Sequence, residues 1–263
     1  MNDRVAVEIS QGVADVRLIR ADKMNALDDA MFQALIDAGD RLKTEPGLRA
    51  VVLSGDGRAF CAGLDRDQFA RMAPGGPSLD LARRSHGVAN RVQYAVWVWR
   101  ELPVPVIAAV HGVAFGGGFQ LMLGADMRYA APETKFSIME IKWGLVPDMA
   151  GTQLLRHLVR DDVARELTYT GRIFSAEEAL GYGLVTRICT DPRAAALESA
   201  REIAGKSPSA IRAAKRLFGA ARTIGTEAGL VQEAVEQEAL IGRADQMEAV
   251  LANLQNRPPV FRD

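Results

Sequence analysis

Cysteine and histidine are scarce in this sequence. Cys61 and Cys189 lie far apart with no CxxC spacing, and the three histidines stand singly, without an HExxH pattern. The beginning of the chain also lacks the basic and apolar stretches of a signal peptide. These absences predict a reducing, cytoplasmic location and no metal site.

Net charge is also almost absent. Lys and Arg number 32 against 33 Asp and Glu, so no global field would attract nucleic acid or a membrane, and we expect neither as a partner. One stretch, residues 104–125, carries no charge and is long enough to cross a bilayer. However, His111, Gln120 and the glycines 116–118 break it into a strand, a turn and a helix, which indicates a protein core.

Several common catalytic motifs are missing. The sequence contains no GxSxG elbow, no GxGxxG, and no Gly-Lys-Ser/Thr after its glycine run, which argues against acyl-enzyme and nucleotide-loop chemistry. The glycines 116–118 instead fall at a strand-to-helix junction, where backbone N–H groups stay free to bind an oxyanion. A second loop near Gly63 would supply further donors. Tight helix packing is the alternative interpretation of the same glycines.

Strand and helix patterns alternate up to Pro192. Alternating apolar and polar residues around Gln11–Gly12 predict a hairpin, and near-helical apolar spacing predicts a helix with Asp28 and Asp29 in its first turn. This alternation, in a chain that is 48% hydrophobic and 25% charged, favours an α/β fold of βα or ββα units. Further expected elements are strands at 49–55 and 106–112, one or two short strands within 126–137, and helices ending at Glu101 and Leu123.

The chain changes character in two places. Residues 66–87 are polar and punctuated by glycine and proline, which predicts a mobile loop beside the site. After Pro192 the pattern is helical throughout. We therefore divide the chain into a core that carries the active site, residues 1–192, and a helical C-terminal region, residues 193–263.

Three segments together resemble the crotonase superfamily of enoyl-CoA hydratases and isomerases: AFCAGLD (59–65), VIAAVHGVAFGGGFQLMLGADMRYAAPETKFSIMEIKWGLVPDMAGTQLL (106–155) and TGRIFSAEEALGYGLVTRI (170–188). The resemblance runs from DKMNAL (22–27) to SPSAIRAAKRLF (207–218). It implies a spiral of ββα units with an α-helical C-terminal subdomain that closes the CoA pocket and forms homotrimers or dimers of trimers. It also implies acyl-CoA as substrate, with no separate cofactor.

The resemblance also assigns binding residues. Leu64 and Gly117 match the two backbone N–H donors of the family's oxyanion hole, and donors of this kind tolerate any side chain that keeps the loop conformation. Basic groups near the C-terminal helices are candidates for the CoA phosphates. The expected CoA and substrate surface comprises Lys23, Ala26, Ala62, Gly63, Asp65 and Gly116.

The carboxylates bear on the reaction. Typical hydratases hold a water between two glutamates, but this chain resembles them only at the second, Glu140, and carries Gln120 at the first. An amide can hydrogen-bond but cannot carry a proton. Asp148 resembles an aspartate of dienoyl-CoA isomerases, so the expected catalytic set is Glu140, Asp148 and Gln120. The simpler alternatives are a surface or N-cap carboxylate for Glu140 and a turn residue for Asp148.

Double-bond isomerisation of an enoyl- or dienoyl-CoA is therefore the leading interpretation. Hydration of a 2-enoyl-CoA is the second, and a non-catalytic protein of the same fold is a third. Thioester hydrolysis and decarboxylation stay open, because the same enolate-stabilising site serves them. Phe115, Trp143 and Met149 could line the acyl pocket, but we expect them to be core residues.

Overall fold

The computed structural model describes residues 3–71 and 80–262. Within these ranges a six-stranded sheet lies at the centre, in the order β1-β2-β3-β4-β6-β8. The first pair is antiparallel and forms the predicted hairpin, and every later pair is parallel. The strands are β1 (Val5–Ser10), β2 (Val13–Leu18), β3 (Ala50–Gly55), β4 (Val106–Val110), β6 (Met127–Ala130) and β8 (Arg187–Ile188).

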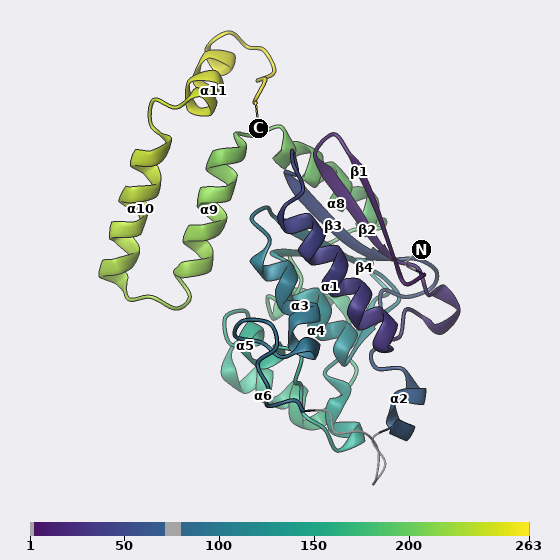
Figure 1. Ribbon diagram of the computed structural model, residues 1–263. Helices are drawn as coiled ribbons and strands as arrows, with labels where there is room; N and C mark the ends of the chain where they lie inside the picture. The colour runs from purple at the N-terminus through teal and green to yellow at the C-terminus, as the bar shows by residue number, and fades with distance from the viewer. Residues whose placement is uncertain (1–2, 72–79, 263) are drawn as a thin grey trace.

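Helices cover both faces of this sheet (Figure 1). On β3, Val51 and Leu53 point into the larger core, whereas Ala50 and Val52 point into the smaller one, as the pleat requires. The predicted α/β class is confirmed. The larger core includes residues of α1 (Asp29–Lys43), α3 (Arg91–Glu101) and α4 (Gly117–Leu123), and the smaller one includes residues of α8 (Pro192–Ala204).

The predicted helix α1 begins at Asp29, and Asp28, which was also expected in the first turn, is its N-cap. The Asp28 side chain accepts a hydrogen bond of 2.7 Å from the Met31 N–H, which satisfies one of the free donors of the first turn.

A second, two-stranded parallel sheet pairs β5 (Val113–Phe115) with β7 (Lys135–Ser137). The sequence interpretation missed β5, because it ran one strand through to Gly112. Gly112 has a φ of +62°, and a Cβ there would lie 2.0 Å from the Arg58 carbonyl oxygen. Only glycine fits this turn, so the chain leaves one sheet and enters the other.

The predicted loop over residues 66–87 is partly wrong, since Arg66–Arg71 form helix α2. Residues 72–79 lie outside the described ranges. The remaining short elements are η1 (Ala21–Lys23), η2 (Met139–Trp143), α5 (Gly151–Leu155), α6 (Asp161–Thr170) and α7 (Ala176–Gly181).

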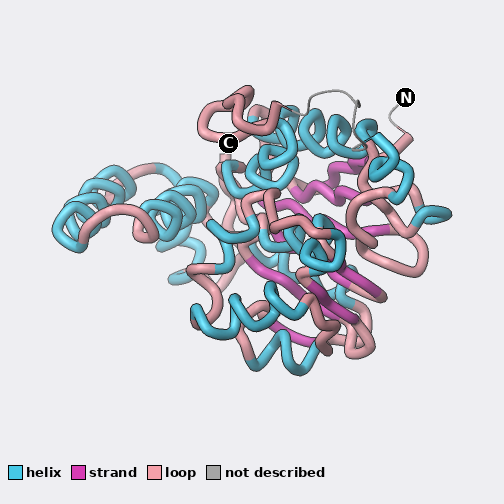
Figure 2. The backbone as a smooth tube through the Cα atoms, turned by 90° about the horizontal axis from the view of Figure 1, so that it is seen from below, coloured by secondary structure: helices cyan, strands magenta, loops and turns pink. Residues whose placement is uncertain are grey.

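The last three helices form an arm that extends away from the core (Figures 1 and 2). They are α9 (Pro208–Ala220), α10 (Thr226–Leu240) and α11 (Ala244–Leu254), and α10 buries no residue. The predicted helical character after Pro192 is confirmed, with α8 on the sheet and the other three in the arm. The arm is tied to the core by the Lys215 ammonium, which lies 2.7 Å from the Val104 carbonyl oxygen and 2.9 Å from Asp126. None of the helices within the described ranges is long and apolar enough to span a membrane.

Candidate active site

Two loops meet beyond the ends of strands β3 and β5. Residues 59–65 follow β3 and residues 116–118 follow β5. The Cys61 N–H donates to Val113, and the Phe115 N–H donates back to Cys61, both at 3.1 Å. The structure therefore brings together the two glycine-containing loops that the sequence singled out.

Each loop presents a free backbone donor. Leu27 and Leu64 form an isolated parallel β-bridge. The Leu27 N–H donates to the Gly63 carbonyl oxygen, and the Asp65 N–H donates to the Leu27 carbonyl oxygen. The Leu64 N–H therefore points away from Leu27. Gly117 is the first residue of α4, where an N–H has no partner within the helix. Among the described residues, neither the Leu64 nor the Gly117 N–H has a hydrogen-bond acceptor.

Close contacts surround the glycines of both loops. Gly63 has a φ of +88°, and a Cβ on it would lie 2.6 Å from the Phe115 carbonyl oxygen and 3.6 Å from the Gly117 nitrogen. A Cβ on Gly117 would lie 2.7 Å from Leu27 Cδ1 and 2.8 Å from Met149 Sδ. The two loops are thus packed against each other with little freedom to move.

Gln120 lies at the centre of the site and is buried. Its Oε1 accepts hydrogen bonds from the Met149 N–H at 2.8 Å and the Gly151 N–H at 3.0 Å. Its Nε2 donates to Glu140 Oε1 at 2.6 Å. Because the oxygen faces two N–H donors, the amide group can only turn its NH₂ toward the carboxylate.

Glu140 is held by Gln120 at one oxygen and left free at the other. Its Oε2 is buried and has no hydrogen-bond partner among the described residues. The carboxylate lies beside Gly116, where an added Cβ would come within 3.5 Å of Oε1. Burial raises the pKa of Glu140, and the charge of Asp148 raises it further against the opposing Gln120 hydrogen bond.

Asp148 directly precedes Met149, whose N–H binds Gln120. The residue is exposed, yet the protein atoms around the carboxylate desolvate it and raise its pKa. Two carboxylates with raised pKa values therefore lie beside the two glycine-containing loops, and Gln120 connects Glu140 to the residue that follows Asp148.

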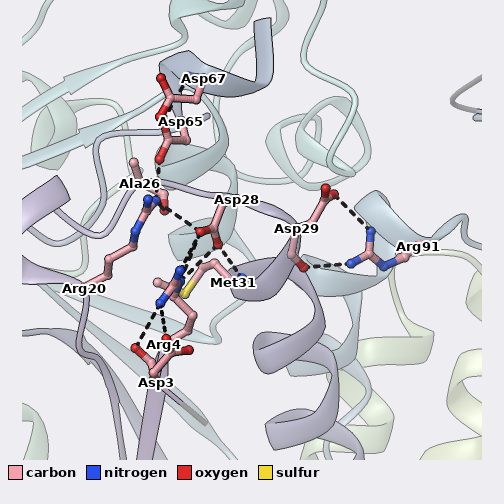
Figure 3. Close-up of polar contacts among 10 residues, drawn as sticks. All are labelled: Asp3, Arg4, Arg20, Ala26, Asp28, Asp29, Met31, Asp65, Asp67 and Arg91. Atoms are coloured by element: carbon pink, nitrogen blue, oxygen red, sulfur yellow. Dashed lines mark hydrogen bonds and ion pairs between the residues drawn. The ribbon is translucent and has the colours of Figure 1, made fainter. Parts of the chain in front are cut away.

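The residues expected to bind CoA lie beside the first loop. Asp65 is buried and forms an ion pair of 2.5 Å with Arg20, whose guanidinium also donates to the Ala26 carbonyl oxygen at 3.0 Å (Figure 3). Burial opposes the charge of Asp65, but the Asp67 N–H and Arg20 outweigh it and lower the pKa. Lys23 is exposed, Ala26 is buried and Ala62 is half-buried. Their contact with CoA stays a prediction.

Sequence reasoning missed the residues that hold the side chains of the site in position. Arg20 had no motif to mark it, although it is charged and lies two residues after the buried strand β2. Gly151 had no motif either, although the structure shows why a glycine stands there: a Cβ would lie 2.6 Å from Gln120 Oε1. Met149 is buried as expected and Phe115 is half-buried, but the core interpretation of Trp143 is wrong. Trp143 ends η2 at the surface, where its side chain stays 46% exposed.

Comparisons with known proteins agree with this fold. The model of the enoyl-CoA hydratase/isomerase family matches residues 8–263. The chain therefore belongs to this family, the crotonases, and is an enzyme of it.

Named relatives differ in reaction. The chain is 34% identical over 254 residues to the mitochondrial Delta(3,5)-Delta(2,4)-dienoyl-CoA isomerase of Pongo abelii, covering 93% of this chain and 77% of the relative. It is 31% identical over 261 residues to the (E)-benzylidenesuccinyl-CoA hydratase of Thauera aromatica, covering 98% of each. The crystal structure of an enoyl-CoA hydratase from Bacillus anthracis matches with a TM-score of 0.89, at 31% identity and 98% coverage of both chains. The family is thus established, and the choice of reaction depends on the site.

Proposed function

We propose that this enzyme moves a double bond along an enoyl- or dienoyl-CoA. The observation that supports this proposal is the direct hydrogen bond of 2.6 Å between Gln120 Nε2 and Glu140 Oε1. Hydratases of the family hold a water between two carboxylates, whereas here an amide occupies one of these places and bonds to the other. The groups left to carry protons are Glu140, through Oε2, and Asp148.

The proposed reaction begins with the thioester carbonyl at the N–H groups of Leu64 and Gly117. One carboxylate removes a proton from C2, and the electron pair moves into a dienolate whose oxygen the two N–H groups stabilise. The second, protonated carboxylate returns a proton to the far end of the conjugated system, which shifts the double bonds. The raised pKa values of Glu140 and Asp148 suit this exchange, because a proton carrier works best when its pKa is near the working pH.

Product analysis in water enriched with heavy oxygen tests this function. Purified protein is incubated with 2-enoyl-, 3-enoyl- and 3,5-dienoyl-CoA, and the products are identified by mass spectrometry. We expect double-bond migration without uptake of heavy oxygen. Efficient uptake into 2-enoyl-CoA with no migration would overturn the proposal in favour of hydration, with Glu140 acting alone.

The arm supports a further proposal, that the enzyme is a trimer or a dimer of trimers. Phe218, Leu230 and Leu254 are 76%, 60% and 77% exposed, and monomers rarely leave so many large apolar side chains of one region in water. Light scattering checks the assembly. We expect Leu230→Glu to lower the mass of the particle, and a wild-type monomer at micromolar concentration would contradict the proposal.

The proposal has two further parts. The enzyme needs no ligand other than acyl-CoA for activity, and it is located in the cytoplasm. Both thiols are free, and burial raises the pKa of Cys61 to about 12, so this thiol is unreactive. A CoA thioester at about 100 times its Kd should stabilise the fold by about 2.7 kcal/mol, which a thermal melt detects. No rise in melting temperature would count against the ligand, and cell fractionation tests the location.

A further inference from the structure

A pocket of about 570 Å³ lies between α3, α5 and the end of α9. It begins at Ala150, which stands between the two residues whose N–H groups bind Gln120. Val88, Trp97 and Leu154 give it an apolar wall. The pocket is therefore continuous with the loop that carries Asp148 and lies outside the catalytic groups themselves.

The charged lining of this pocket is entirely cationic. Four arginines and a histidine line it, and no aspartate or glutamate does so among the described residues. Asp126, outside the lining, pairs with Arg100 at 3.2 Å and with Lys215 at 2.9 Å, and its charge only partly offsets the burial of Arg222 and the repulsion from Arg100. The four cationic lining residues are Arg84, Arg100, Arg156 and Arg222, whereas His157 accepts a hydrogen bond from Arg156 and is neutral, because burial and the neighbouring arginines lower its pKa.

The other arginines have no acidic partner within the described residues. Arg84 donates to two backbone carbonyls and to the Gln93 amide, and Arg156 donates to His157 at 3.0 Å. Arg222 forms no ion pair there. Burial lowers the pKa of Arg222, and the nearby Arg100 lowers it further, so the cations repel one another. An anion in the pocket would relieve this repulsion.

We propose that the pocket binds a carboxylate at the far end of the acyl group. This inference rests on the proposed function, because it assumes that the thioester lies at Leu64 and Gly117. The apolar wall would cover the methylene groups, while Arg156 and Arg222 receive the carboxylate in the paired geometry that guanidinium favours. The preferred substrate is then a CoA monothioester of an unsaturated dicarboxylic acid.

Binding of saturated esters tests the proposal without any chemistry. Calorimetry compares hexanoyl-, octanoyl- and decanoyl-CoA with the esters of the same length that end in a carboxylate. At one or more lengths we expect the carboxylate to tighten binding by about 10- to 100-fold. The double variant Arg156→Gln/Arg222→Gln should lose this preference and keep the affinity for methyl-ended esters, whereas Arg201→Gln, on the distant α8, should keep both. Equal affinity of each pair at every length would overturn the proposal.

Two further measurements distinguish a carboxylate subsite from a separate anion site and from an interface between copies of the chain. Free octanedioate and inorganic phosphate are titrated into the wild type with octanoyl-CoA already bound. If either binds with a free energy as large as the gain that the terminal carboxylate gives the ester, the pocket takes a separate anion and the proposal is wrong. If the double variant changes the mass of the particle in light scattering, the cations belong to an interface and the proposal is also wrong. Failure of double-bond migration would remove the proposed reaction but leave the binding preference measurable.

Discussion

The pKa values of carboxylates are shifted in opposite directions in the site and in the arm. Desolvation by the surrounding protein raises the pKa of Glu140 and Asp148, and neither forms an ion pair within the described residues. In the arm, the Arg216 hydrogen bond lowers the pKa of Glu236, and Arg257 lowers that of Glu248 to about 2. The site thus gives up stability to keep proton carriers with raised pKa values, whereas the arm uses its charges to hold helices that bury few apolar side chains.

The largest expected effect is that of Glu140→Gln. The variant keeps an acceptor for Gln120 but loses the proton carrier, so kcat for double-bond migration should fall by about 10²- to 10⁴-fold with little change in substrate binding. Steady-state kinetics measure the change. Glu133→Gln, at an exposed position, is the control and should be silent. Near wild-type turnover in Glu140→Gln would exclude Glu140 as the base.

The same variant should be more stable than the wild type at neutral pH. A raised pKa in the folded state means that the contribution of Glu140 to stability is fully present below pH 4.5 and is lost as pH rises through the folded pKa. Melting curves from about pH 4 to 8 should therefore show the stability gain of Glu140→Gln growing with pH. A loss of stability at neutral pH would contradict the description of the site.

The second largest effect is expected for Gly117→Pro, compared with Gly117→Ala. Both variants place a Cβ against Leu27 and Met149, but only proline removes the N–H. Proline is tolerated at the first position of a helix, so the fold should persist. We expect Pro to lower kcat by about 10²- to 10³-fold relative to Ala. Equal activity of the two variants would refute the donor assignment.

Gln120→Glu should have a smaller effect, seen mainly in the pH profile. The new carboxylate would lie near the position of Nε2, now 2.6 Å from Glu140 Oε1, so the pair would share one proton. The rising limb of the profile of kcat/KM should move up by about 1–3 pH units. Gln237→Glu on the arm is the control and should leave the profile unchanged. A gain in heavy-oxygen uptake would instead favour hydration.

The smallest effect is that of Glu248→Gln, and its sign is opposite to that of Glu140→Gln. Because the folded pKa is lowered to about 2, the charge of Glu248 stabilises the fold above pH 4.5, and this contribution is lost as pH falls through about 2. The variant should melt slightly below the wild type at neutral pH, and the gap should narrow on acidification. Glu238→Gln on the same arm serves for comparison. A constant gap would show that the ion pair with Arg257 is not its cause.

The sequence predicted elements well where the pattern was local. The hairpin around Gln11–Gly12, the start of α1 just after Asp28 and the glycine-led helix α4 all follow from short-range chemistry. The second sheet was missed, because the turn at Gly112 depends on a contact with Arg58, which is distant in sequence. Helix α2 was missed because its polar residues have no apolar periodicity to mark them.

The same division holds at the site. Glu140 and Asp148 were found by motif, but the hydrogen bonds that orient Gln120 come from the backbone of Met149 and Gly151, which no motif describes. The role of Arg20 depends on Asp65, which lies far along the chain. Contacts between backbone groups, or between distant charges, leave little trace in a single sequence.

The chain of charges in Figure 3 connects the beginning of the protein to its chemistry. Arg4 binds Asp28 at 2.9 Å, Asp28 lies 3.5 Å from Arg20, and Arg20 binds Asp65 in the loop that presents Leu64. Proteolysis after Arg4 would leave every group near the substrate intact, yet it would remove Arg4, the first residue of this series of ion pairs. We expect such trimmed protein to lose activity while its active site looks unchanged, which makes an intact N-terminus the first property to verify in any preparation.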